Sequence, residues 1–523
     1  MQLDLPELAG LRLPPFAYAD DLALLATSAA GLQRQIDLLQ QYCTDRGLTV
    51  NLAKTKVMLL AGADSEDQAS GRVQRAGFTY ARKRLEGTCS FKYLGVVFHC
   101  TQPLGESAAE GRAAVARYAA AMFEGRCTHL GLEASRLLLQ VYSQMVDSSL
   151  CYGAAVWAPG LALAAAKRQV VGGSGYSPPE TLHHRMLRRL LGLPWRAPIA
   201  TILAEAGQTP LHISWLVRAA RFWNSLLDAP AGSVTHAVVE AGLQMAADSA
   251  GLAAAQLPWL AQLSQAMAAA GVAFDPAQRE ALSPAIVRST ALRRYQQQVA
   301  TAAQQDGASQ LHHYFVRVRP ECLAGPAAYC IAPYLVEVRE RRRRLALTEL
   351  RTGVHWGAES QERIRGPARR PAAERICPHC AAAGLPEVVE DTRHMVFSCT
   401  LYSGFRSNYP HLFTRAPPRR VPPLEPAGTP LQPPSQLAPR LWLPPTPHHQ
   451  PPASPPPPPP PPPAAPTQPQ PGTAGGGGGA GVPPSPGAAI TTLTEFFGGP
   501  AVDLASFCGS CRRLGRQRAG LPP

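Results

Sequence analysis

The first hundred residues alternate short apolar runs with polar intervals. The apolar runs Leu13 to Tyr18 and Leu22 to Ala26 predict two short strands, and the Ala-Asp-Asp between them predicts a tight turn. Ser28 then precedes apolar positions at helical spacing and Gly47 follows them, which predicts a helix with a cap at each end. The apolar positions of this helix are Leu32, Ile36, Leu39 and Cys43. The later run from Ser90 to Phe98 predicts a further strand.

The rest of the chain changes character in blocks. From about residue 104 to 350 the sequence is rich in Ala and Leu and mostly helical, with breaks predicted at 172–179 and 275–284. Residues 417–487 contain runs of proline and glycine that cannot bury a core, so we expect disorder there. The predicted fold class is α+β, with a short C-terminal helix after the low-complexity tract. The predicted domains are 1–103, 104–230, 231–350, 351–416, 417–487 and 488–523.

Composition permits a nucleic-acid partner without specifying one. The chain has 523 residues, a net charge of +14 and a pI near 9.4. A basic balance supplies salt-dependent affinity for phosphate, although an excess of Arg, Ala, Pro and Gly also fits a GC-rich genome. No segment predicts a membrane span or a signal peptide, so the predicted location is nuclear or cytoplasmic. The run Arg341 to Arg344 is open to two interpretations, a nuclear address or a solvated helix face.

Two neighbouring carboxylates, Asp20 and Asp21, stand at the predicted turn between the first two strands. Buried carboxylates are costly without a cation, and Mg²⁺ prefers such hard oxygen ligands while keeping positions open for phosphate oxygens. Two metals held in this way activate an attacking hydroxyl and stabilise a leaving pyrophosphate. An exposed turn with two solvated aspartates is equally compatible with these letters.

Cysteine and histidine spacing predicts a second metal site. Cys377, Cys380, His394 and Cys399 follow the pattern C-x2-C-x13-H-x4-C, which provides four ligands for a tetrahedral structural Zn²⁺. His379 lies inside the first pair and is a competing ligand. The alternative is coincidence in a chain with 12 cysteines and 14 histidines. A second pair near the C-terminus, at positions 508 and 511, has no matching half and lies on a helical pattern.

Three motifs occur in order within the first hundred residues: YADD at 18–21, GLTVNLAKTKVM at 47–58 and FKYLGVVF at 91–98. Together they resemble the palm of reverse transcriptases, most closely that of non-LTR (LINE-type) retrotransposons. Residues 106–157 and 190–227 resemble the helical regions that follow the palm in these elements. Residues 340–412 resemble their C-terminal zinc-binding segment. The resemblance implies an RNA-directed DNA polymerase whose partners are an RNA template and a DNA primer or target.

The resemblance also implies roles for individual residues. Asp20 is expected to bind catalytic Mg²⁺ directly and Asp21 less directly, with Tyr18 supporting the hairpin near the primer terminus. Lys54 is expected to protonate the departing pyrophosphate; Lys56 is the near alternative, and simple phosphate or solvent contact is an equal one. The expected primer-grip hairpin contains Phe91, Tyr93, Leu94 and Gly95, where Gly95 allows close approach of a nucleic-acid backbone. A strand core is the alternative for its two aromatic residues. The expected basic nucleic-acid contacts are Arg341, Arg342, Arg343 and Arg344.

One part of the expected catalytic set is missing from this pattern. Polymerases of this type hold their metals with three carboxylates, and the third comes from a strand upstream of YADD. Asp4 and Glu7 precede the motif, but neither lies in the expected strand, and the fingers are absent. We therefore expect an N-terminally truncated polymerase that is inactive alone and whose palm sheet lacks partner strands. The alternatives are a non-catalytic RNA- or DNA-binding remnant and a scaffold whose polyproline tract binds a partner.

Overall fold

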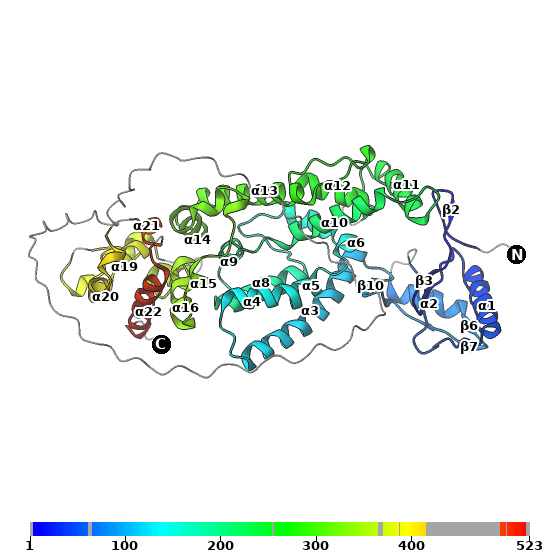
Figure 1. Ribbon diagram of the computed structural model, residues 1–523, viewed down its shortest axis with the longest axis horizontal. Coiled ribbons are helices and arrows are strands. Elements are labelled where there is room, and N and C mark those ends of the chain that lie inside the picture. The colour runs from blue at the N-terminus through cyan, green and yellow to red at the C-terminus, as the bar shows by residue number, and fades with distance from the viewer. Residues whose placement is uncertain are drawn as a thin grey trace, which may run out of the picture. The chain divides into compact units, whose positions relative to one another are not determined.

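The computed structural model describes residues 4–60, 65–253, 256–364, 370–385, 387–414, 492–497 and 499–518. All of them except Thr414 belong to one compact unit, in which the segment after 490 joins the residues before 414. The predicted low-complexity tract at 417–487 lies outside the described residues. The described part mixes helices with small sheets, which agrees with the predicted α+β class (Figure 1).

Residues 4–99 combine short strand pairs with two helices. The strands are β1 (Glu7–Leu8), β2 (Leu11–Arg12), β3 (Phe16–Tyr18), β4 (Asp21–Ala23), β5 (Lys56–Val57), β6 (Thr79–Tyr80), β7 (Lys83–Arg84), β8 (Glu86–Gly87), β9 (Ser90–Tyr93) and β10 (Val96–His99). Among the described residues every sheet has two strands: β1–β2, β3–β4, β6–β7 and β9–β10 are antiparallel, and β5–β8 is parallel. Two helices accompany them, α1 (Ala29–Asp45) and α2 (Glu66–Ala76).

Helix α1 begins and ends where the sequence pattern predicts. Ser28 is its N-cap, and the Ser28 hydroxyl accepts a hydrogen bond from the backbone N–H of Gly31 at 3.1 Å. Gly47 follows the C-terminal end in the left-handed conformation, with φ of 64°. The apolar pattern alone is wrong in predicting one strand from Ser90 to Phe98, because Leu94 and Gly95 make a tight turn. The run folds into the β9–β10 hairpin, which agrees with the hairpin that the resemblance implies.

Residues 104–351 are mostly helical, and the label η marks short 3-10 or π-helical elements. The elements are α3 (Leu104–His129), α4 (Ser135–Tyr142), η1 (Ser143–Asp147), α5 (Ser148–Leu150), α6 (Ala154–Trp157), α7 (Pro159–Lys167), α8 (Pro178–Leu191), α9 (Ile199–Ala206), α10 (Leu211–Leu227), α11 (Val234–Ala247), α12 (Trp259–Ala269), η3 (Pro276–Gln278), α13 (Pro284–Gln305), α14 (Gln310–His312), η4 (His313–Val318), η5 (Pro320–Leu323), η6 (Pro326–Ala328), α15 (Tyr334–Glu337) and α16 (Arg341–Arg351). The predicted breaks are confirmed, since α8 begins at Pro178 after a loop and α13 begins at Pro284.

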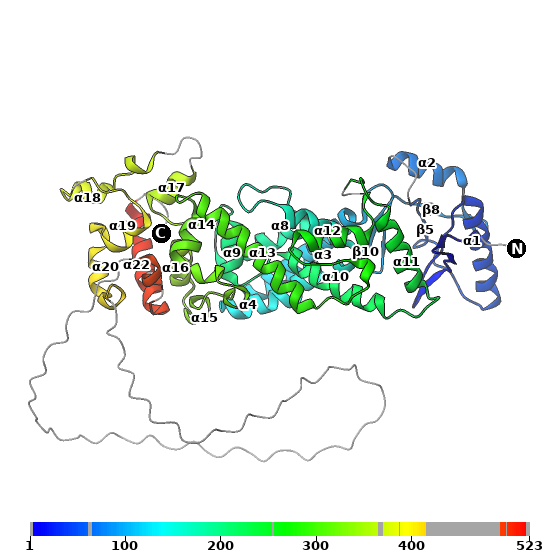
Figure 2. The same cartoon turned by 90° about the horizontal axis from the view of Figure 1, so that it is seen from above.

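The C-terminal elements are short except for the last helix. They are α17 (Ala358–Ile364), η8 (Ala372–Glu374), α18 (Pro378–Ala382), α19 (Thr392–Phe397), η9 (Thr400–Tyr402), α20 (Ser403–Asn408), η10 (Pro410–Leu412), α21 (Leu493–Phe497) and α22 (Ala501–Arg518). Helix α22 lies beside α16 and α20 (Figure 2). Arg512 donates to Glu349 on α16, with Nε and Oε2 2.7 Å apart. Cys508 and Cys511 are buried on α22, as the helical pattern predicts.

One large apolar core joins the helices, and a small one lies among the strands. The large core includes Trp157 and Trp215, whose ring centroids are 5.7 Å apart, and continues to Phe496 and Phe507 in the C-terminal helices. The small core consists of buried Ile36, Val57, Phe78 and Leu85. Most apolar surface removed from water therefore lies in the helical part, where burial contributes most of the folding free energy.

A charged network is buried inside the large core. Glu205 on α9 is fully buried, and its Oε1 lies 2.8 Å from Nε of Arg351 on α16. The second oxygen, Oε2, is 3.8 Å from Nη1 of Arg319 and accepts a hydrogen bond from the Tyr314 hydroxyl. Burial raises the pKa of the Glu205 carboxyl, but the two guanidinium groups outweigh that effect and hold the pKa below its usual value.

Across the described residues, no helix is both long and apolar enough to cross a membrane.

Candidate functional site

The YADD motif forms an exposed hairpin. Tyr18 on β3 pairs with Asp21 on β4, so Ala19 and Asp20 are the two turn residues. Ala19 has a φ of 53°, which is strained for a residue with a Cβ. Asp20 and Asp21 are both exposed, and the Tyr18 side chain is 65% exposed. The hairpin thus holds two carboxylates in water, where a divalent cation and a phosphate ligand have free access.

The upstream carboxylate Asp4 has a structural role. It accepts hydrogen bonds from the hydroxyls of Thr27 and Ser28 at the start of α1, and these bonds, Ser28 first, lower the pKa of Asp4. Within the described ranges, Cys377, Cys380, His394 and Cys399 are the one group of three or more His, Cys, Asp or Glu side chains close enough to share a metal ion. A third carboxylate therefore does not meet Asp20 and Asp21 in this part of the chain.

The two candidate lysines differ in their surroundings. Lys56 on β5 makes an ion pair with Glu86 on the neighbouring strand β8, with Nζ and Oε2 2.5 Å apart. Lys54 is exposed in the turn before β5, and its backbone N–H donates to the Asn51 carbonyl at 3.1 Å. Among the described residues no ion pair engages the Lys54 ammonium. The geometry favours Lys54 over Lys56 for contact with phosphate.

The turn of the β9–β10 hairpin is held from inside the protein. Leu94 and Gly95 both have positive φ, 46° and 81°, as in the two-residue turns that match strand twist. The Tyr152 hydroxyl donates to the Leu94 carbonyl at 3.0 Å, and Nη1 of Arg112 donates to the Gly95 carbonyl at 3.1 Å. Arg112 also donates through Nε to the Ser149 carbonyl and covers the Tyr152 ring.

The packing around the turn explains why residue 95 is a glycine. A Cβ at Gly95 would lie 2.9 Å from Cε1 of Tyr152, so the close neighbour is a side chain of the protein itself. The expectation that Gly95 leaves room for a nucleic-acid backbone needs correction, because Tyr152 fills that space. The Phe91 side chain is 36% exposed, and Tyr93 is half-buried. Phe91 is thus accessible to a ligand and is not a core residue of the strand.

The arginine run at the start of α16 divides into exposed and buried members. Arg341 and Arg342 are exposed, and Arg343 bonds to Glu340 and Ser506. Arg344 is buried and donates to the carbonyls of Val338, Arg339 and Glu133. The expectation that Arg344 contacts nucleic acid is wrong, because the guanidinium group is used to tie α16 to the loop before α4.

The predicted zinc ligands converge. Cys377, Cys380, His394 and Cys399 are all buried, and their ligand atoms lie within 4.8 Å of one another. The first two flank the start of α18, after a bridge between Ile376 and Val389. The other two come from α19 and the residue before η9. Asp391 fixes α19 by accepting the backbone N–H of His394 at 2.6 Å.

The distances between these atoms fit tetrahedral zinc. Zn–S bonds of about 2.3 Å and Zn–N bonds of about 2.0 Å place two sulfurs ~3.8 Å apart and a sulfur and nitrogen ~3.5 Å apart. Sγ of Cys377 and Cys399 are 3.7 Å apart, and Sγ of Cys380 is 3.4 Å from Nε2 of His394. Nε2 is thus the nitrogen of His394 that is placed to coordinate a metal ion. Nδ1 of His394 is buried without a hydrogen-bond partner among the described residues, and His379 is not in the group.

Burial opposes the ionisation of two of the three thiols: it raises the pKa of Cys377 and raises the pKa of Cys399 to about 12. Burial also raises the pKa of Cys380, but hydrogen bonds with Thr400 outweigh that effect and lower the pKa, and burial lowers the pKa of His394. Zinc binds thiolates and neutral imidazole, so it would displace the thiol protons and compensate the cost of burying their charge. Three thiols and an imidazole, all buried, therefore fit a structural Zn²⁺ better than a hard cation.

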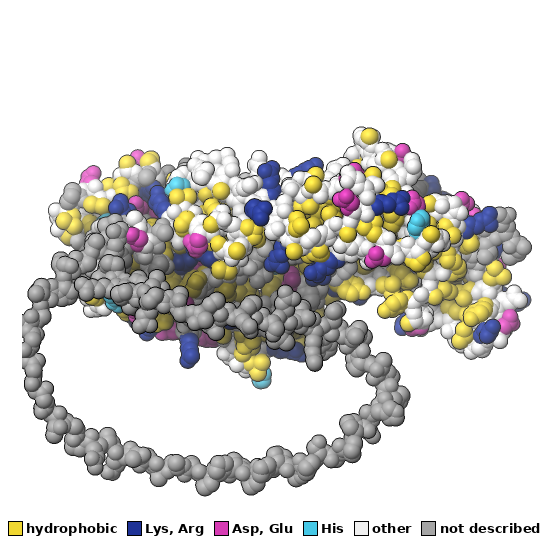
Figure 3. Space-filling model, turned by 45° about the horizontal axis from the view of Figure 1, so that its top comes forward, with side chains coloured by type: hydrophobic (Ala, Val, Ile, Leu, Met, Phe, Trp, Pro, Cys, Tyr) yellow, Lys and Arg dark blue, Asp and Glu magenta, His cyan; other side chains and the backbone are white. Residues whose placement is uncertain are grey.

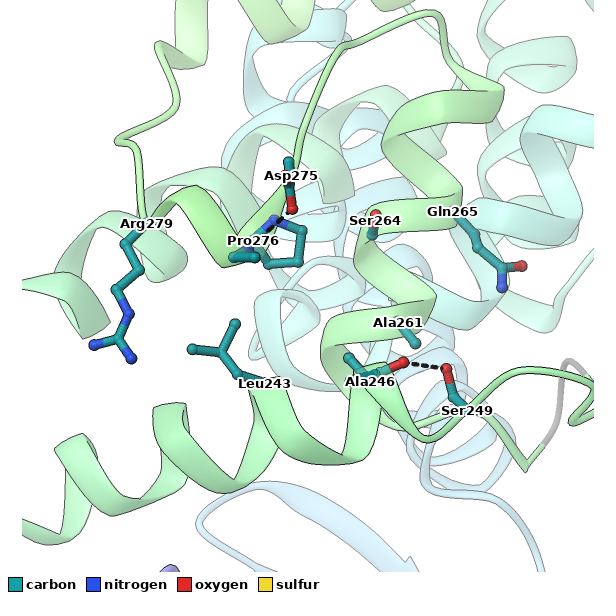
Figure 4. Close-up of a pocket in the computed structure, with 11 residues that line it drawn as sticks. Leu243, Ala246, Ser249, Ala261, Ser264, Gln265, Asp275, Pro276 and Arg279 are labelled. Atoms are coloured by element: carbon teal, nitrogen blue, oxygen red, sulfur yellow. Dashed lines mark hydrogen bonds between the residues drawn. The ribbon is translucent and has the colours of Figure 1, made fainter.

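A hollow of about 440 Å³ lies between α11, α12 and η3 (Figure 4). Its wall is mostly alanine and other small side chains, and none of the sequence-predicted residues reaches it. Asp275 accepts from the backbone of Ala277, and Arg279 pairs with Glu240 at 2.8 Å. Its charged groups are therefore already used within the protein.

Comparison with known proteins agrees with the N-terminal hairpins. Residues 8–98 match the family model of reverse transcriptase (RNA-dependent DNA polymerase). None of the curated proteins matches the chain. The match supports a reverse transcriptase, for which RNA and DNA are the substrates and Mg²⁺ is the usual metal. It includes the YADD hairpin, both candidate lysines and the β9–β10 hairpin up to Phe98.

Proposed function

We propose that the chain is the palm-to-C-terminus portion of a non-LTR retrotransposon reverse transcriptase. The observation that carries the proposal is the exposed β3–β4 hairpin, which presents Asp20 and Asp21 inside the matched residues 8–98. A second motif of the resemblance, the β9–β10 hairpin, lies in the same segment. The Cys and His cluster at residues 377–399 is the further feature that the resemblance leads us to expect.

Each candidate residue has a role in this proposal. Asp20 and Asp21 would hold Mg²⁺, which supplies activation of the primer hydroxyl and stabilisation of the leaving pyrophosphate. Lys54, exposed and without an ion pair among the described residues, protonates the pyrophosphate oxygen as it departs. Tyr18 contacts the primer terminus from the same hairpin. Phe91 and Tyr93 contact the primer strand from β9.

Polymerisation needs one more carboxylate than the hairpin supplies. Two exposed carboxylates leave the metals weakly held and the reacting groups without a fixed in-line geometry. We therefore propose that the chain alone does not extend a primer, and that activity requires a third carboxylate delivered to the β3–β4 hairpin by additional polypeptide.

Primer extension on an RNA template with Mg²⁺ tests the proposal. The chain is compared with a version extended upstream through its genomic locus, each with and without D20A/D21A. Asp45→Ala is the matched control, because Asp45 is an exposed carboxylate at the end of α1. We expect extension only by the longer chain, lost in D20A/D21A and kept in D45A. Extension by the chain itself, lost in D20A/D21A, would refute the missing-carboxylate argument.

A second candidate function is nucleic-acid binding without catalysis. The observation that favours it is that the Cys and His cluster is fully assembled, whereas the carboxylate pair is not joined by a third ligand within the described ranges. Arg and Lys side chains are also spread over the visible face in several small groups (Figure 3). If neither the chain nor the version extended upstream extends a primer, and the chain binds RNA or DNA in a salt-dependent way, this second function is supported.

A further inference from the structure

Trp195 stands out among the large apolar side chains of the described residues. It is 78% exposed, more than any other of them, while Trp157, Trp215, Trp223 and Trp356 are buried. Leaving an indole in water forgoes the folding free energy that burying it would contribute. Trp259 is partly buried, so Trp195 is the one exposed tryptophan among the described residues.

Trp195 is presented by an anchored turn. The backbone N–H of Ala197 donates to the Pro194 carbonyl at 3.1 Å, which makes Trp195 and Arg196 the two central residues of a β-turn between α8 and α9. Leu193 and Ala197 on either side are buried, and Nη2 of Arg188 donates to the Ala197 carbonyl at 3.2 Å. The turn is thus fixed at both ends while its two central side chains project into solvent.

The neighbouring charges are basic. The Arg196 guanidinium lies 5.6 Å from the centre of the Trp195 ring, a cation–π arrangement. Arg185 and Arg189, one helical turn apart on α8, are exposed on the helix that leads into the turn. Arg189 also pairs with Glu124 at 2.8 Å, whereas no ion pair engages Arg185 within the described ranges. The turn therefore presents an exposed indole ring and a guanidinium group, and the helix before it presents two more guanidinium groups.

We propose that the turn between α8 and α9 is a stacking platform for one unpaired nucleobase of a single strand of RNA or DNA. Trp195 stacks on the base, and Arg196 and Arg185 contact the adjoining phosphates. A protein partner would require a continuous apolar patch, yet Pro194 is the one other exposed apolar side chain of the turn, and Leu193 and Ala197 are buried. A lone indole with basic neighbours suits a base and its phosphates instead.

The site does not depend on the proposed polymerase chemistry, so its test omits Mg²⁺ and nucleotides. Fluorescence anisotropy of labelled oligo(U), oligo(dT) and a duplex of equal length measures binding to the full chain. Trp195→Ala is expected to weaken binding of the single strands by about 5- to 150-fold, the range that one base–aromatic stack supplies. Trp195→Phe keeps most of the affinity because a ring remains. The duplex is expected to show little change, since its bases are already stacked.

Charge variants separate stacking from phosphate contact. Arg196→Ala and Arg185→Ala are each expected to reduce the slope of log affinity against log salt by roughly 0.7, whereas W195A leaves the slope unchanged. Tyr118→Ala is the matched control, since Tyr118 on α3 is an aromatic side chain that is 72% exposed. Intrinsic fluorescence gives an independent readout, because quenching by oligo(dT) is expected in the wild type and reduced in W195F.

Two outcomes would overturn the proposal. Equal affinities of the wild type and W195A for both single strands would mean that Trp195 touches no base. An equal loss for the duplex would mean that the turn senses charge or overall fold rather than unpaired bases. A loss confined to oligo(U) or to oligo(dT) supports the site and identifies which strand it takes. Repeating the assay in D20A/D21A keeps the result separate from the fate of the polymerase proposal.

Discussion

Residues 4–99 and the helical part of the chain differ in their secondary structure and in the size of their apolar cores. The first has two-stranded sheets and a small apolar cluster, and the second has a continuous core from α3 to α22. Backbone strain follows the same division. Of the six described non-glycine residues with positive φ, five lie in the first region, and Arg279 is the exception. These five are Ala9, Ala19, Ala81, Arg82 and Leu94.

The division also separates two kinds of candidate metal ligand. Asp20 and Asp21 are held in water on a strained turn, whereas the Cys and His cluster is buried and assembled. Strain persists where the surrounding structure outweighs it, and it concentrates where groups must be presented to a ligand. The contrast indicates that the first region presents exposed ligands from a small core, whereas the second encloses its ligands in a large one. The predictions below test how independent the two regions are.

The largest expected effect is loss of the zinc cluster. Cys399→Ser removes one of four ligands, and metal binding contributes on the order of 10 kcal/mol to the folding of small zinc units. We expect metal analysis to find one zinc per chain in the wild type and a large loss in C399S. Limited proteolysis should then cut within 370–414 while residues 4–99 keep their wild-type protection.

Cys330→Ser is the control for the zinc prediction, because Cys330 is an exposed free thiol outside the cluster. It should retain zinc and the wild-type digestion pattern. Absence of zinc from the wild type under reducing, metal-replete conditions would contradict the assignment of the buried cluster. Spread of the cleavage to residues 4–99 would show that the two regions are more tightly coupled than the separate cores suggest.

The next effect concerns the buried charge network of the helical region. Glu205→Gln leaves Arg351 and Arg319 without their carboxylate, so we expect a loss of about 3–5 kcal/mol in the free energy of unfolding. Because the folded pKa of Glu205 is lowered from 4.5, its contribution is fully present above that pH and is lost as pH falls through the folded value. Urea unfolding at a series of pH values measures both effects.

Glu340→Gln provides the matched comparison for the charge network. Glu340 pairs with Arg343 on the surface, and such exposed pairs contribute about 0–1 kcal/mol. A similar loss in E340Q and E205Q would mean that burial of the Glu205 network adds nothing. Retention of the wild-type acid dependence in E205Q would show that other carboxyl groups cause the loss of stability at low pH.

Sequence reasoning succeeded where local chemistry decides the outcome. Ser28 at the start of α1, the breaks before Pro178 and Pro284, and the spacing of the Cys and His cluster all depend on a few neighbouring residues. The YADD hairpin formed for the same reason, with shorter strands than the apolar runs predict. Local rules of this kind can be applied without knowing what packs against the segment.

Long-range contacts decided the features that sequence reasoning missed. The apolar pattern missed the turn at Leu94, which carries no Asn or Asp and is held by Arg112 and Tyr152 from distant segments; only the resemblance implied a hairpin there. Arg344 belongs to a basic run, yet its burial follows from the approach of the loop before α4. Trp195 gave no periodic signal at all. Its significance comes from exposure, which a single sequence does not reveal.

A moderate effect is expected where the two regions meet. Arg112→Ala removes the hydrogen bonds from α3 to the carbonyls of Gly95 and Ser149, at an expected cost of about 1–3 kcal/mol. Because the Gly95 carbonyl belongs to the hairpin turn, amide exchange of residues 90–99 should accelerate more than exchange of the large core. Arg117→Ala, on an exposed position of α3, should leave both unchanged. Uniform acceleration across the chain would instead assign Arg112 to global stability.

The smallest expected effect is a gain in the stability of the β9–β10 hairpin. Leu94 adopts a φ of 46°, which Asn tolerates better than Leu, and Asn-Gly is the preferred pair for a two-residue turn with positive φ at both positions. Leu94→Asn should therefore stabilise the β9–β10 hairpin by up to about 1 kcal/mol. The hydrogen bond from Tyr152 should persist because it reaches the backbone carbonyl. Slower amide exchange at residues 90–99 is the expected readout.

Leu22→Asn makes the same chemical change where no positive φ exists. The two leucines are similarly exposed, 39% at Leu94 and 42% at Leu22, so loss of apolar contact should be comparable. Only L94N should gain stability, because Leu94 has a positive φ that Asn tolerates better and Leu22 does not. Equal behaviour of the two variants would mean that Leu94 carries no strain penalty. The weakness of the first region would then come from its small core rather than from the turns that present its ligands.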